Sequence, residues 1–397
     1  MMFARILKEE NIEICAICDI DIQRTSQFKE MFGVKDKYIF NDADKFFQGG
    51  KFSDIIIIST NDDTHYDYTM RALELGYDIL LEKPIALSEY QVLGIYRKAR
   101  ELNRKIGVCH VLRYTPFYMK MKELISSGEI GKVTNINQTE NVGYWHFSHS
   151  FVRGNWHNSK ETCPSILAKC CHDLDLILWL SGKSCEAVSS FGNLIYFKKE
   201  NMPEGAAKRC KNCMYKNTCI YSAYVLYKKR PFMVKQPVVR DYTVENAFDV
   251  IDNNDYFYDK CVYQCDNDVC DHQIVNMSLK DGVIANLTMT AFSNECYRRT
   301  QVCGTRGEIN GLIEKGEIRI ARFGEKEEII QISVDDKISQ HNGGDKLLLL
   351  DFIQHVEGRL NSKCFTTLDK SIESHIIAFA AERSRHNSGS SEKIDFD

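Results

Sequence analysis

One run of the sequence, DIIIIS at residues 54–59, constrains the fold more than any other. Consecutive β-branched residues fit a strand that is buried on both faces, which is typical of parallel sheets covered by helices on both sides. Apolar strands are also predicted at 12–18, 77–81 and 106–111, and helices at 22–32, 63–75 and 88–103. This alternation predicts an α/β, Rossmann-like parallel-sheet domain over residues 1–113, with its ligand at the carboxyl ends of the strands.

After residue 113 the pattern changes. One helix is predicted at 164–181, and strands predominate at 133–142, 186–197, 272–279, 283–292 and 298–303. The pair Asp281-Gly282 between two alternating runs is typical of a hairpin turn. Residues 114–397 are therefore predicted to form an α+β domain with a mostly antiparallel, open sheet and an irregular, cysteine-bearing insertion at 200–265.

Composition limits the class of protein. A length of 397 residues favours two domains over one core. A formal net charge of -4 gives no reason to expect nucleic acid or an anionic membrane surface as partner, and no apolar run is long enough to span a bilayer. The first ten residues do not resemble a signal peptide, so a cytoplasmic location is expected. In that compartment the 16 cysteines are expected to be buried thiols or metal ligands.

The tripeptide Glu82-Lys83-Pro84 directly follows a predicted buried strand. Lys83 would then lie at the ligand-binding edge of the sheet, where a lysine can take part in acid–base chemistry. Pro84 would end the strand pairing. The alternative is an ordinary solvated lysine in a loop between a strand and a helix.

Two further polar groups stand at informative positions. His172 lies on the predicted helix 164–181 beside two acidic residues, and a histidine titrates near neutral pH and can move a proton. The alternative is a core histidine on an amphipathic helix. Asp19 follows the strand at 12–18, where a carboxylate can bind both hydroxyls of an adenosine ribose. Asp19 or Asp21 could equally cap the next helix.

In order and spacing these motifs resemble those of the Gfo/Idh/MocA oxidoreductases over nearly the whole chain. The resemblance rests on CDIDIQR at 18–24, STNDDTH at 59–65, the Glu-Lys-Pro motif and HDLD at 172–175. In that family a Rossmann domain binds NAD(P), and a second domain with an open sheet carries the sugar or inositol site. The resemblance implies Lys83 and His172 as the catalytic acid/base pair. It also implies cofactor contacts by Asp19, Arg24, Thr60, Asn61, His65, Glu82 and Lys83.

The sequence departs from the family pattern in three places. It begins inside what would be the first helix and lacks the preceding central strand and glycine-rich turn that hold the pyrophosphate. A start site placed too far downstream or a truncated gene is the simplest expectation, and a relative without cofactor is the alternative. Asn61 stands where the family usually has proline. Ala168 stands where many members carry an acidic residue, so either Lys169 takes part in catalysis or the substrate class differs.

Residues 140–156 interleave aromatic rings with His, Arg and Asn. Such a segment suits a polyol or glycoside, through ring stacking and hydrogen bonds to hydroxyls. The alternative is an aromatic-rich core loop. Substrate contacts are predicted for His110, Arg113, Tyr144, Trp145, His146, Arg153, Trp156 and Asp173, with residues 266–268, 271 and 272 facing them.

Cysteine spacing suggests a metal centre in the insertion. Cys210, Cys213 and Cys219 form a C-x2-C-x5-C pattern, and three thiolates need a fourth ligand, for which Cys261 or Cys265 is the candidate. The insertion is expected to contain few apolar residues, so a structural zinc or iron–sulfur centre would stabilise it. The alternative is free thiols in a loop.

The leading hypothesis is an NAD(P)-dependent oxidoreductase that moves hydride to or from a secondary hydroxyl of a sugar, cyclitol or glycoside. NAD is favoured over NADP, because a carboxylate at Asp19 would repel a 2′-phosphate. Two alternatives stay open: redox-assisted glycoside cleavage, and a non-catalytic sugar-binding or regulatory relative that lost the cofactor. The family resemblance also implies a homo-oligomer, a dimer or a tetramer.

Overall fold

The computed structural model describes residues 2–230, 257–333, 343–359 and 362–395, together with residues 233, 248 and 251. The chain forms two compact units. Unit 1 combines residues 1–124 with 332–375, and unit 2 combines residues 125–331 with 376–397. This division differs from the predicted boundary at residue 113, because residues 114–124 and a late segment of the chain belong to unit 1. Much of the predicted insertion at 200–265, namely most of 231–256, lies outside the described residues.

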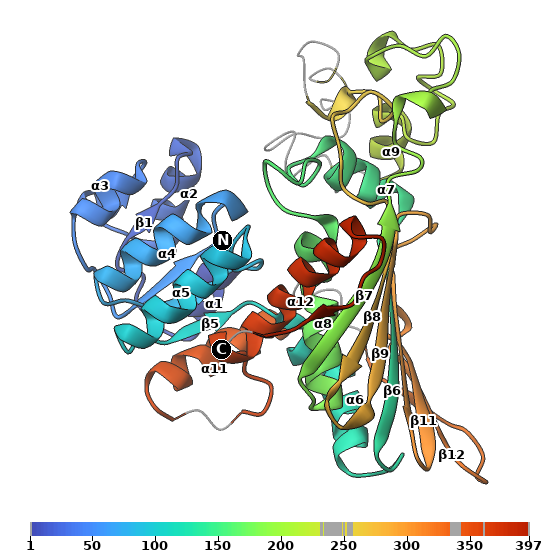
Figure 1. Ribbon diagram of the computed structural model, residues 1–397. Helices are drawn as coiled ribbons and strands as arrows, with labels where there is room; N and C mark the ends of the chain where they lie inside the picture. The colour runs from blue at the N-terminus through green and yellow to red at the C-terminus, as the bar shows by residue number, and fades with distance from the viewer. Residues whose placement is uncertain are drawn as a thin grey trace. The chain divides into compact units, whose positions relative to one another are not determined.

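The parallel sheet of unit 1 has the strand order β3-β4-β5. Its strands are β3 (Ile55–Ile58), β4 (Asp78–Leu81) and β5 (Ile106–Val108). Helices α4 (His65–Glu74) and α5 (Glu89–Glu101) connect them (Figure 1). Ile58 pairs with Leu81, and Leu81 pairs with Val108. The three strands therefore end level with one another, and the residues that follow them share one edge.

A second, smaller parallel sheet pairs β1 (Ile17–Cys18) with β2 (Ile39–Phe40). The described strands of unit 1 thus fall into two sheets and do not form one continuous Rossmann sheet. Around these strands lie α1 (Met2–Glu9), α2 (Ile22–Phe32), η1 (Asp36–Tyr38) and α3 (Ala43–Gln48).

The core of unit 1 combines residues from both ends of the chain. Phe3 and Ile6 of α1 pack in one cluster with Leu80 of β4 and with Phe352 of α11 (Gly344–Val356). A Cβ at Gly344 would lie 2.7 Å from the Val111 carbonyl oxygen, so only glycine allows this close approach. The remaining elements are η2 (Asp62–Thr64), η3 (Val111–Tyr114) and α6 (Pro116–Ser126), and the division between the units falls within α12 (Leu368–His386).

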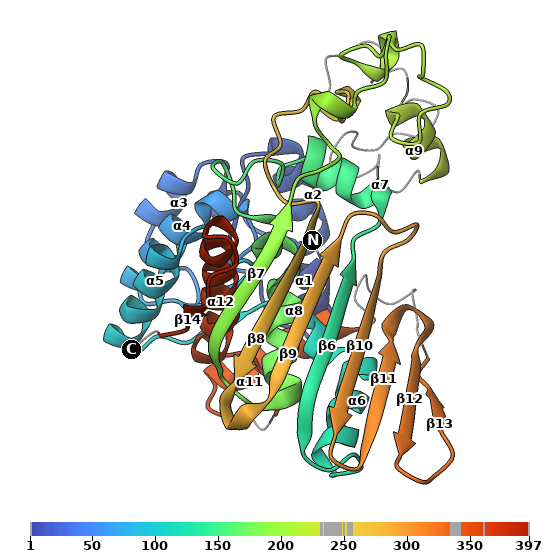
Figure 2. The same cartoon turned by 45° about the vertical axis from the view of Figure 1, so that its right-hand side comes forward.

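Unit 2 is built on a nine-stranded sheet in the order β13-β12-β11-β10-β6-β9-β8-β7-β14 (Figure 2). All neighbouring pairs are antiparallel except β6 and β9. This confirms the predicted mostly antiparallel sheet. Its strands are β6 (Val133–Asn141), β7 (Cys185–Asn193), β8 (His272–Leu279), β9 (Ile284–Thr290), β10 (Tyr297–Gly304), β11 (Gly307–Leu312), β12 (Glu317–Arg322), β13 (Glu328–Gln331) and β14 (Glu392–Lys393).

Helix α8 (Ser165–Ser181) packs against β6 and β9 on one face of this sheet. Along β8, Val275 and Met277 are buried, whereas Ile274 on the opposite face is 44% exposed. Between β8 and β9 the predicted turn is present, with φ of 61° at Asp281 and 74° at Gly282. Positive φ at both positions is what an Asp-Gly hairpin turn requires.

The insertion between β7 and β8 lies beyond the ends of these strands in both views (Figures 1 and 2). Its described elements are η5 (Lys199–Asn201), η6 (Cys210–Asn212), α9 (Ala223–Lys229) and η8 (Phe257–Asp259). Leu226 and Tyr227 of α9 belong to an apolar cluster of their own. The expectation that the insertion lacks apolar residues is therefore wrong.

Unit 2 also contains the short helical segments α7 (Tyr144–Phe147), the π-helix η4 (Ser148–Arg153), η9 (Lys280–Gly282) and η10 (Ile313–Lys315). Among the described residues, each helix is too short or too polar to cross a membrane.

Candidate functional site

In unit 1 the Glu-Lys-Pro motif follows β4 directly, as predicted. The Glu82 amide donates to the Ile58 carbonyl over 2.9 Å, and the Cys109 amide donates to the Leu81 carbonyl over 2.9 Å. Lys83 is half-buried, and the Lys83–Pro84 peptide bond is cis. Lys83 therefore lies at the edge where the parallel strands end, which is where ligands bind in such sheets.

Two buried histidines hold the backbone immediately after Lys83. The Nδ1 atom of His65 lies 2.7 Å from the Pro84 carbonyl oxygen, and its Nε2 atom lies 3.3 Å from the Thr60 carbonyl oxygen. The Ile85 amide donates to Nε2 of His375 over 2.9 Å. Both rings are fully buried. His65, predicted to lie near the cofactor, thus connects the ends of β3 and β4, and His375 is a positioning residue that the sequence analysis did not identify.

The electrostatics around Lys83 involve several buried acidic groups. Loss of hydration raises the pKa of Glu82, and the Lys83 charge partly opposes this rise. Asp345, at the start of α11, adds to the rise. Burial and the Glu82 carboxylate raise the pKa of the Cys109 thiol well above its ordinary value. No sequence motif connected Asp345 with Lys83, because Asp345 lies 264 positions after the end of β4.

At the end of β1 the two aspartates have different roles. The Asp21 side chain accepts from the amides of Gln23 and Arg24 and caps α2. Asp19 is left at the strand end, where its side chain is 28% exposed and lies 3.5 Å from the Arg24 guanidinium. This placement suits the adenosine ribose contact predicted for Asp19.

The remaining predicted cofactor residues follow β3. Thr60 and Asn61 are exposed, and the hydroxyls of Thr60 and Thr64 lie 2.6 Å apart. Asp19 thus follows a strand of the two-stranded sheet, whereas Thr60 and Asn61 follow a strand of the three-stranded sheet, and their cofactor contacts stay predictions.

His110 and Arg113, predicted to contact substrate, are both buried within unit 1. The His110 ring lies 5.8 Å from the His375 ring. Arg113 belongs to η3, where its charge acts with burial to lower the pKa of Lys122. His110 is 1% exposed and Arg113 is 3% exposed, which favours packing roles for both side chains.

In unit 2 a buried network of charges joins α8 to the sheet. Glu140 on β6 pairs across the sheet with Arg298 on β10, over 2.8 Å, and lies 3.4 Å from the ammonium of Lys169. Burial raises the pKa of Glu140, and the Arg298 and Lys169 cations oppose that rise. Lys169 is thus fixed by a carboxylate of the sheet. Glu140 and Arg298 were not among the predicted site residues.

Asp173 lies deeper in the same network. Its carboxylate accepts from Gln138 over 2.7 Å and from Arg298 over 3.0 Å, and its side chain is fully buried. The predicted substrate contact by Asp173 is therefore not supported, because both neighbours already occupy the carboxylate. The Asp173 carboxylate is placed so that it can orient the Arg298 side chain.

His172 lies on α8 three residues after Lys169, which places the two side chains on the same side of the helix. His172 is 9% exposed. Nδ1 of His146 lies 3.6 Å from the Cys296 sulfur. Burial raises the pKa of Cys296 to about 12, against the effect of the Lys169 charge. Unit 2 thus brings together His146, Lys169 and Cys296.

The predicted aromatic segment divides between two environments. Tyr144 and Trp145 pack against the apolar cluster of the insertion, and Trp156 stacks on Phe151 at 5.8 Å. Arg153 is 1% exposed, and its guanidinium donates to backbone carbonyls of the insertion. These contacts give Arg153 a role in holding the insertion, and a substrate contact by Arg153 stays a prediction.

The opposite wall predicted at residues 266–272 is also structural. Asp268 accepts from the amide and hydroxyl of Ser159 over 2.6 and 2.7 Å. Asp271 is fully buried and accepts from the amides of Ile195 and Tyr196. These carboxylates fix the ends of the insertion.

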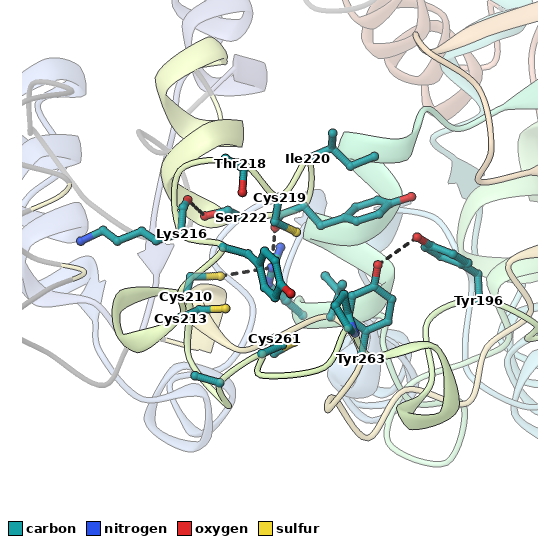
Figure 3. Close-up of a pocket in the computed structure, with 17 residues that line it drawn as sticks. Tyr196, Cys210, Cys213, Lys216, Thr218, Cys219, Ile220, Ser222, Cys261 and Tyr263 are labelled. Atoms are coloured by element: carbon teal, nitrogen blue, oxygen red, sulfur yellow. Dashed lines mark hydrogen bonds between the residues drawn. The ribbon is translucent and has the colours of Figure 1, made fainter.

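The four predicted cysteine ligands belong to the insertion of unit 2 and line one cavity (Figure 3). Among the described residues, no cysteine forms a disulfide.

Comparison with known proteins shows the family. The oxidoreductase family's NAD-binding Rossmann fold matches residues 2–110, and its C-terminal alpha/beta domain matches residues 122–389. The protein YteT of Bacillus subtilis is 26% identical over 372 residues, covering 88% of this chain and 85% of that protein.

Two solved structures have the same fold. An inositol dehydrogenase homolog of Azotobacter vinelandii, complexed with NAD+, has a TM-score of 0.68 at 14% identity and covers 96% of this chain and 90% of that one. A levoglucosan dehydrogenase, complexed with NADH and levoglucosan, has a TM-score of 0.69 at 15% identity, with the same coverage of 96% and 90%. The chain belongs to the Gfo/Idh/MocA family of oxidoreductases, and its N-terminal part is the family's NAD-binding domain.

Proposed function

We propose that this protein transfers hydride between NAD and a secondary hydroxyl of a sugar, cyclitol or glycoside. Membership of the oxidoreductase family supports the reaction class. The observation that carries the proposal is Lys83, held at the carboxyl edge of the parallel sheet by the anchored backbone after it. When bound, NAD supplies the hydride acceptor, and the protein supplies orientation and proton transfer.

In this proposal Lys83 and His172 manage the proton of the substrate hydroxyl. Lys83 belongs to unit 1, whereas His172 and Lys169 belong to unit 2. Lys169 would take the place of the acidic residue that many relatives carry, and its pairing with Glu140 would fix its position. His146, Trp145, Tyr144 and Trp156 remain candidates for substrate contact.

The polyol class of substrate rests on similarity and on side-chain chemistry. The similar solved structures include an inositol dehydrogenase homolog and a levoglucosan dehydrogenase. His146 offers a hydrogen-bonding ring beside Cys296, which suits a substrate with neighbouring hydroxyls.

Four other predictions remain part of this proposal. They are a cytoplasmic location, a homo-oligomer, the absence of a nucleic-acid partner, and a structural metal held by Cys210, Cys213, Cys219 and Cys261.

The first test is cofactor binding followed by nicotinamide fluorescence, with NADH and NADPH titrated in parallel. We expect NADH to bind more tightly, because Asp19 disfavours a 2′-phosphate. Net release of NADH with a polyol substrate would support dehydrogenation, whereas glycoside cleavage without net NADH would indicate internal recycling. If neither cofactor binds, the enzyme hypothesis fails and a non-catalytic sugar-binding role replaces it.

The second test is the Lys83→Met variant, in which the side chain keeps an apolar stem and loses its amine. We expect kcat to fall by about 100-fold or more, the range for loss of a general acid or base, while NADH binding persists. The matched control is Lys120→Met on α6, where the lysine pairs with Glu123 and activity should be unchanged. Equal activity of the Lys83→Met variant and the native protein would contradict the assignment.

A further inference from the structure

Four thiols surround a cavity of about 260 Å³ in the insertion of unit 2. Cys210, Cys213, Cys219 and Cys261 line it, and Figure 3 shows the first three turning their sulfur atoms toward the middle of the lining residues. Cys265, the other candidate from the sequence, is not among the described residues that line it. Its sulfur instead contacts the Cys261 carbonyl oxygen at 3.3 Å.

Successive turns place three of these cysteines on one wall. The Cys213 amide donates to the Cys210 carbonyl over 3.1 Å, and the Lys216 amide donates to the Cys213 carbonyl over 3.0 Å. The Cys219 amide then donates to the Tyr215 carbonyl over 2.9 Å. These turns thus bring the three cysteines of the C-x2-C-x5-C pattern to the same cavity.

The fourth thiol comes from a distant part of the chain. The Cys261 amide donates to the Lys208 carbonyl over 2.9 Å. Two residues before it, the fully buried Asp259 pairs with Arg209 at 3.2 Å and accepts from the Lys211 amide at 3.1 Å. These contacts fix the backbone around Cys261 beside the turn at 208–211 without using any thiol, so the fold itself brings Cys261 to the cavity.

A buried cation faces the same cavity. Arg153 is 1% exposed and is one of the lining residues. Its Nε and Nη2 atoms donate to the carbonyls of Lys260 and Tyr221, both over 2.6 Å, and Nη2 lies 3.8 Å from the Cys210 sulfur. Its Nη1 atom is buried without a hydrogen-bond partner, and within the described part of the chain no carboxylate pairs with it.

Among the described residues Arg153 has no counter-charge, and a negative charge in the cavity would supply one. A guanidinium stays protonated in proteins, and leaving it buried without a counter-charge is strongly unfavourable. Neutral thiols do not supply that charge. Thiolates bound to a metal centre do, because a centre with four cysteine ligands is anionic overall.

We propose that Cys210, Cys213, Cys219 and Cys261 hold an iron–sulfur cluster, with Arg153 as its buried counter-charge. A single tetrahedral zinc ion, with Zn–S bonds of about 2.3 Å, would bring its four sulfur atoms within about 4 Å of one another. Among the described residues, no three of these sulfur atoms lie within 4.8 Å of one another. A cluster accepts wider spacing because each cysteine binds a different iron, and the cavity leaves room for its inorganic sulfide.

The cluster would be structural. It would tie the turns at 210–219 to the segment at 259–261, and the apolar cluster next to it includes Cys210. Tyr144 and Trp145 pack against that apolar cluster, so loss of the metal centre would loosen a segment proposed to contact substrate.

The direct test is the metal content of the full chain, produced with ample iron and purified without oxygen. We expect iron and acid-labile sulfide in equal amounts, about four of each per chain for the cubane form, with a broad visible absorption that dithionite bleaches. Stoichiometric zinc without sulfide would overturn the proposal, and so would a folded protein without metal. This readout does not depend on catalysis, so it stands apart from the proposed oxidoreductase activity.

Matched variants assign the ligands. Cys213→Ser and Cys261→Ser should each lose most of the iron, whereas Cys265→Ser, four residues from Cys261, should retain it. Equal iron in all three variants would overturn the assignment. If the ligand variants do not fold, removal of iron from the native protein by a chelator and reconstitution with iron and sulfide provides the second measurement. Recovery of the visible absorption supports the cluster, and recovery of the fold with zinc alone contradicts it.

Discussion

At the scale of single residues, two nearby aspartates have different roles because their surroundings differ. Asp19 and Asp21 are chemically alike and two positions apart, and either could cap the following helix. In the structure Asp21 takes the two free amides of α2, and its side chain is mostly buried. Asp19 therefore keeps acceptor capacity for a ligand, and Arg24 lies beside it.

The first prediction concerns cofactor choice. Asp19→Ser removes a carboxylate that would bind ribose hydroxyls and repel a 2′-phosphate, while Arg24 remains to attract that phosphate. Hydrogen bonds to a charged group contribute about 1.5–3 kcal/mol, so the dissociation constant for NADH should rise about 10- to 100-fold. The affinity for NADPH should rise, as measured by nicotinamide fluorescence.

A suitable control is Asp36→Ser, which removes an exposed carboxylate that pairs with Lys29 in the same unit. Its affinity for both cofactors should match that of the native protein. An unchanged preference in Asp19→Ser would show that this carboxylate does not meet the ribose.

At the scale of elements, the backbone after Lys83 depends on two helices that the sequence does not connect with it. His65 starts α4, and His375 lies within α12 near the end of the chain. Its neutral ring accepts from the Ile85 amide through Nε2, and Nδ1 lies 3.0 Å from the Ser371 carbonyl oxygen. Protonation of Nε2 would break the contact with Ile85.

The second prediction is a loss of stability in acid. Burial, together with the nearby His110 and Lys83, lowers the pKa of His375 from 6.5 to about 3. Between these two pKa values, His375 therefore binds a proton in the unfolded state but not in the folded state. The contribution is fully present above about pH 6.5 and is lost as pH falls toward about 3, at up to about 1.4 kcal/mol per pH unit.

Urea unfolding at several pH values measures this effect. The native protein should lose stability more steeply below pH 6.5 than His375→Gln, which cannot titrate. His386→Gln removes an exposed histidine of the same helix and should keep the native slope. Identical slopes for the native protein and His375→Gln would contradict the prediction.

At the scale of the whole molecule, the sheet of unit 2 leaves one face open. Helix α8 covers the face that includes Val275 and Met277. On the other face Ile274 is 44% exposed and Ile284 is 62% exposed. Exposed apolar side chains on a sheet face favour association with another copy of the chain, as the family resemblance implies.

The third prediction is therefore a homo-oligomer that a charge on this face disrupts. Light scattering after size-exclusion chromatography should give a dimer or tetramer for the native protein and a smaller species for Ile284→Lys. Ile20→Lys, at a position 84% exposed in unit 1, should leave the mass unchanged. A native monomer at micromolar concentration would refute the prediction.

The sequence by itself determined the features that depend on short stretches of chain. The β-branched run at 54–59 formed the buried strand β3, Glu82-Lys83-Pro84 followed β4, and Asp281-Gly282 formed the hairpin turn. Each follows from periodicity or turn chemistry within a few residues.

The tertiary structure decided which polar groups remain accessible. Arg153 and Asp173 stand in motifs that suggested substrate contact, yet both are buried by partners more than 30 residues away, such as Tyr221 for Arg153 and Gln138 for Asp173. His375 and Asp345 approach the Glu-Lys-Pro motif from the far end of the chain. Burial and charge pairing depend on long-range packing, and a local pattern carries no information about what will pack against it.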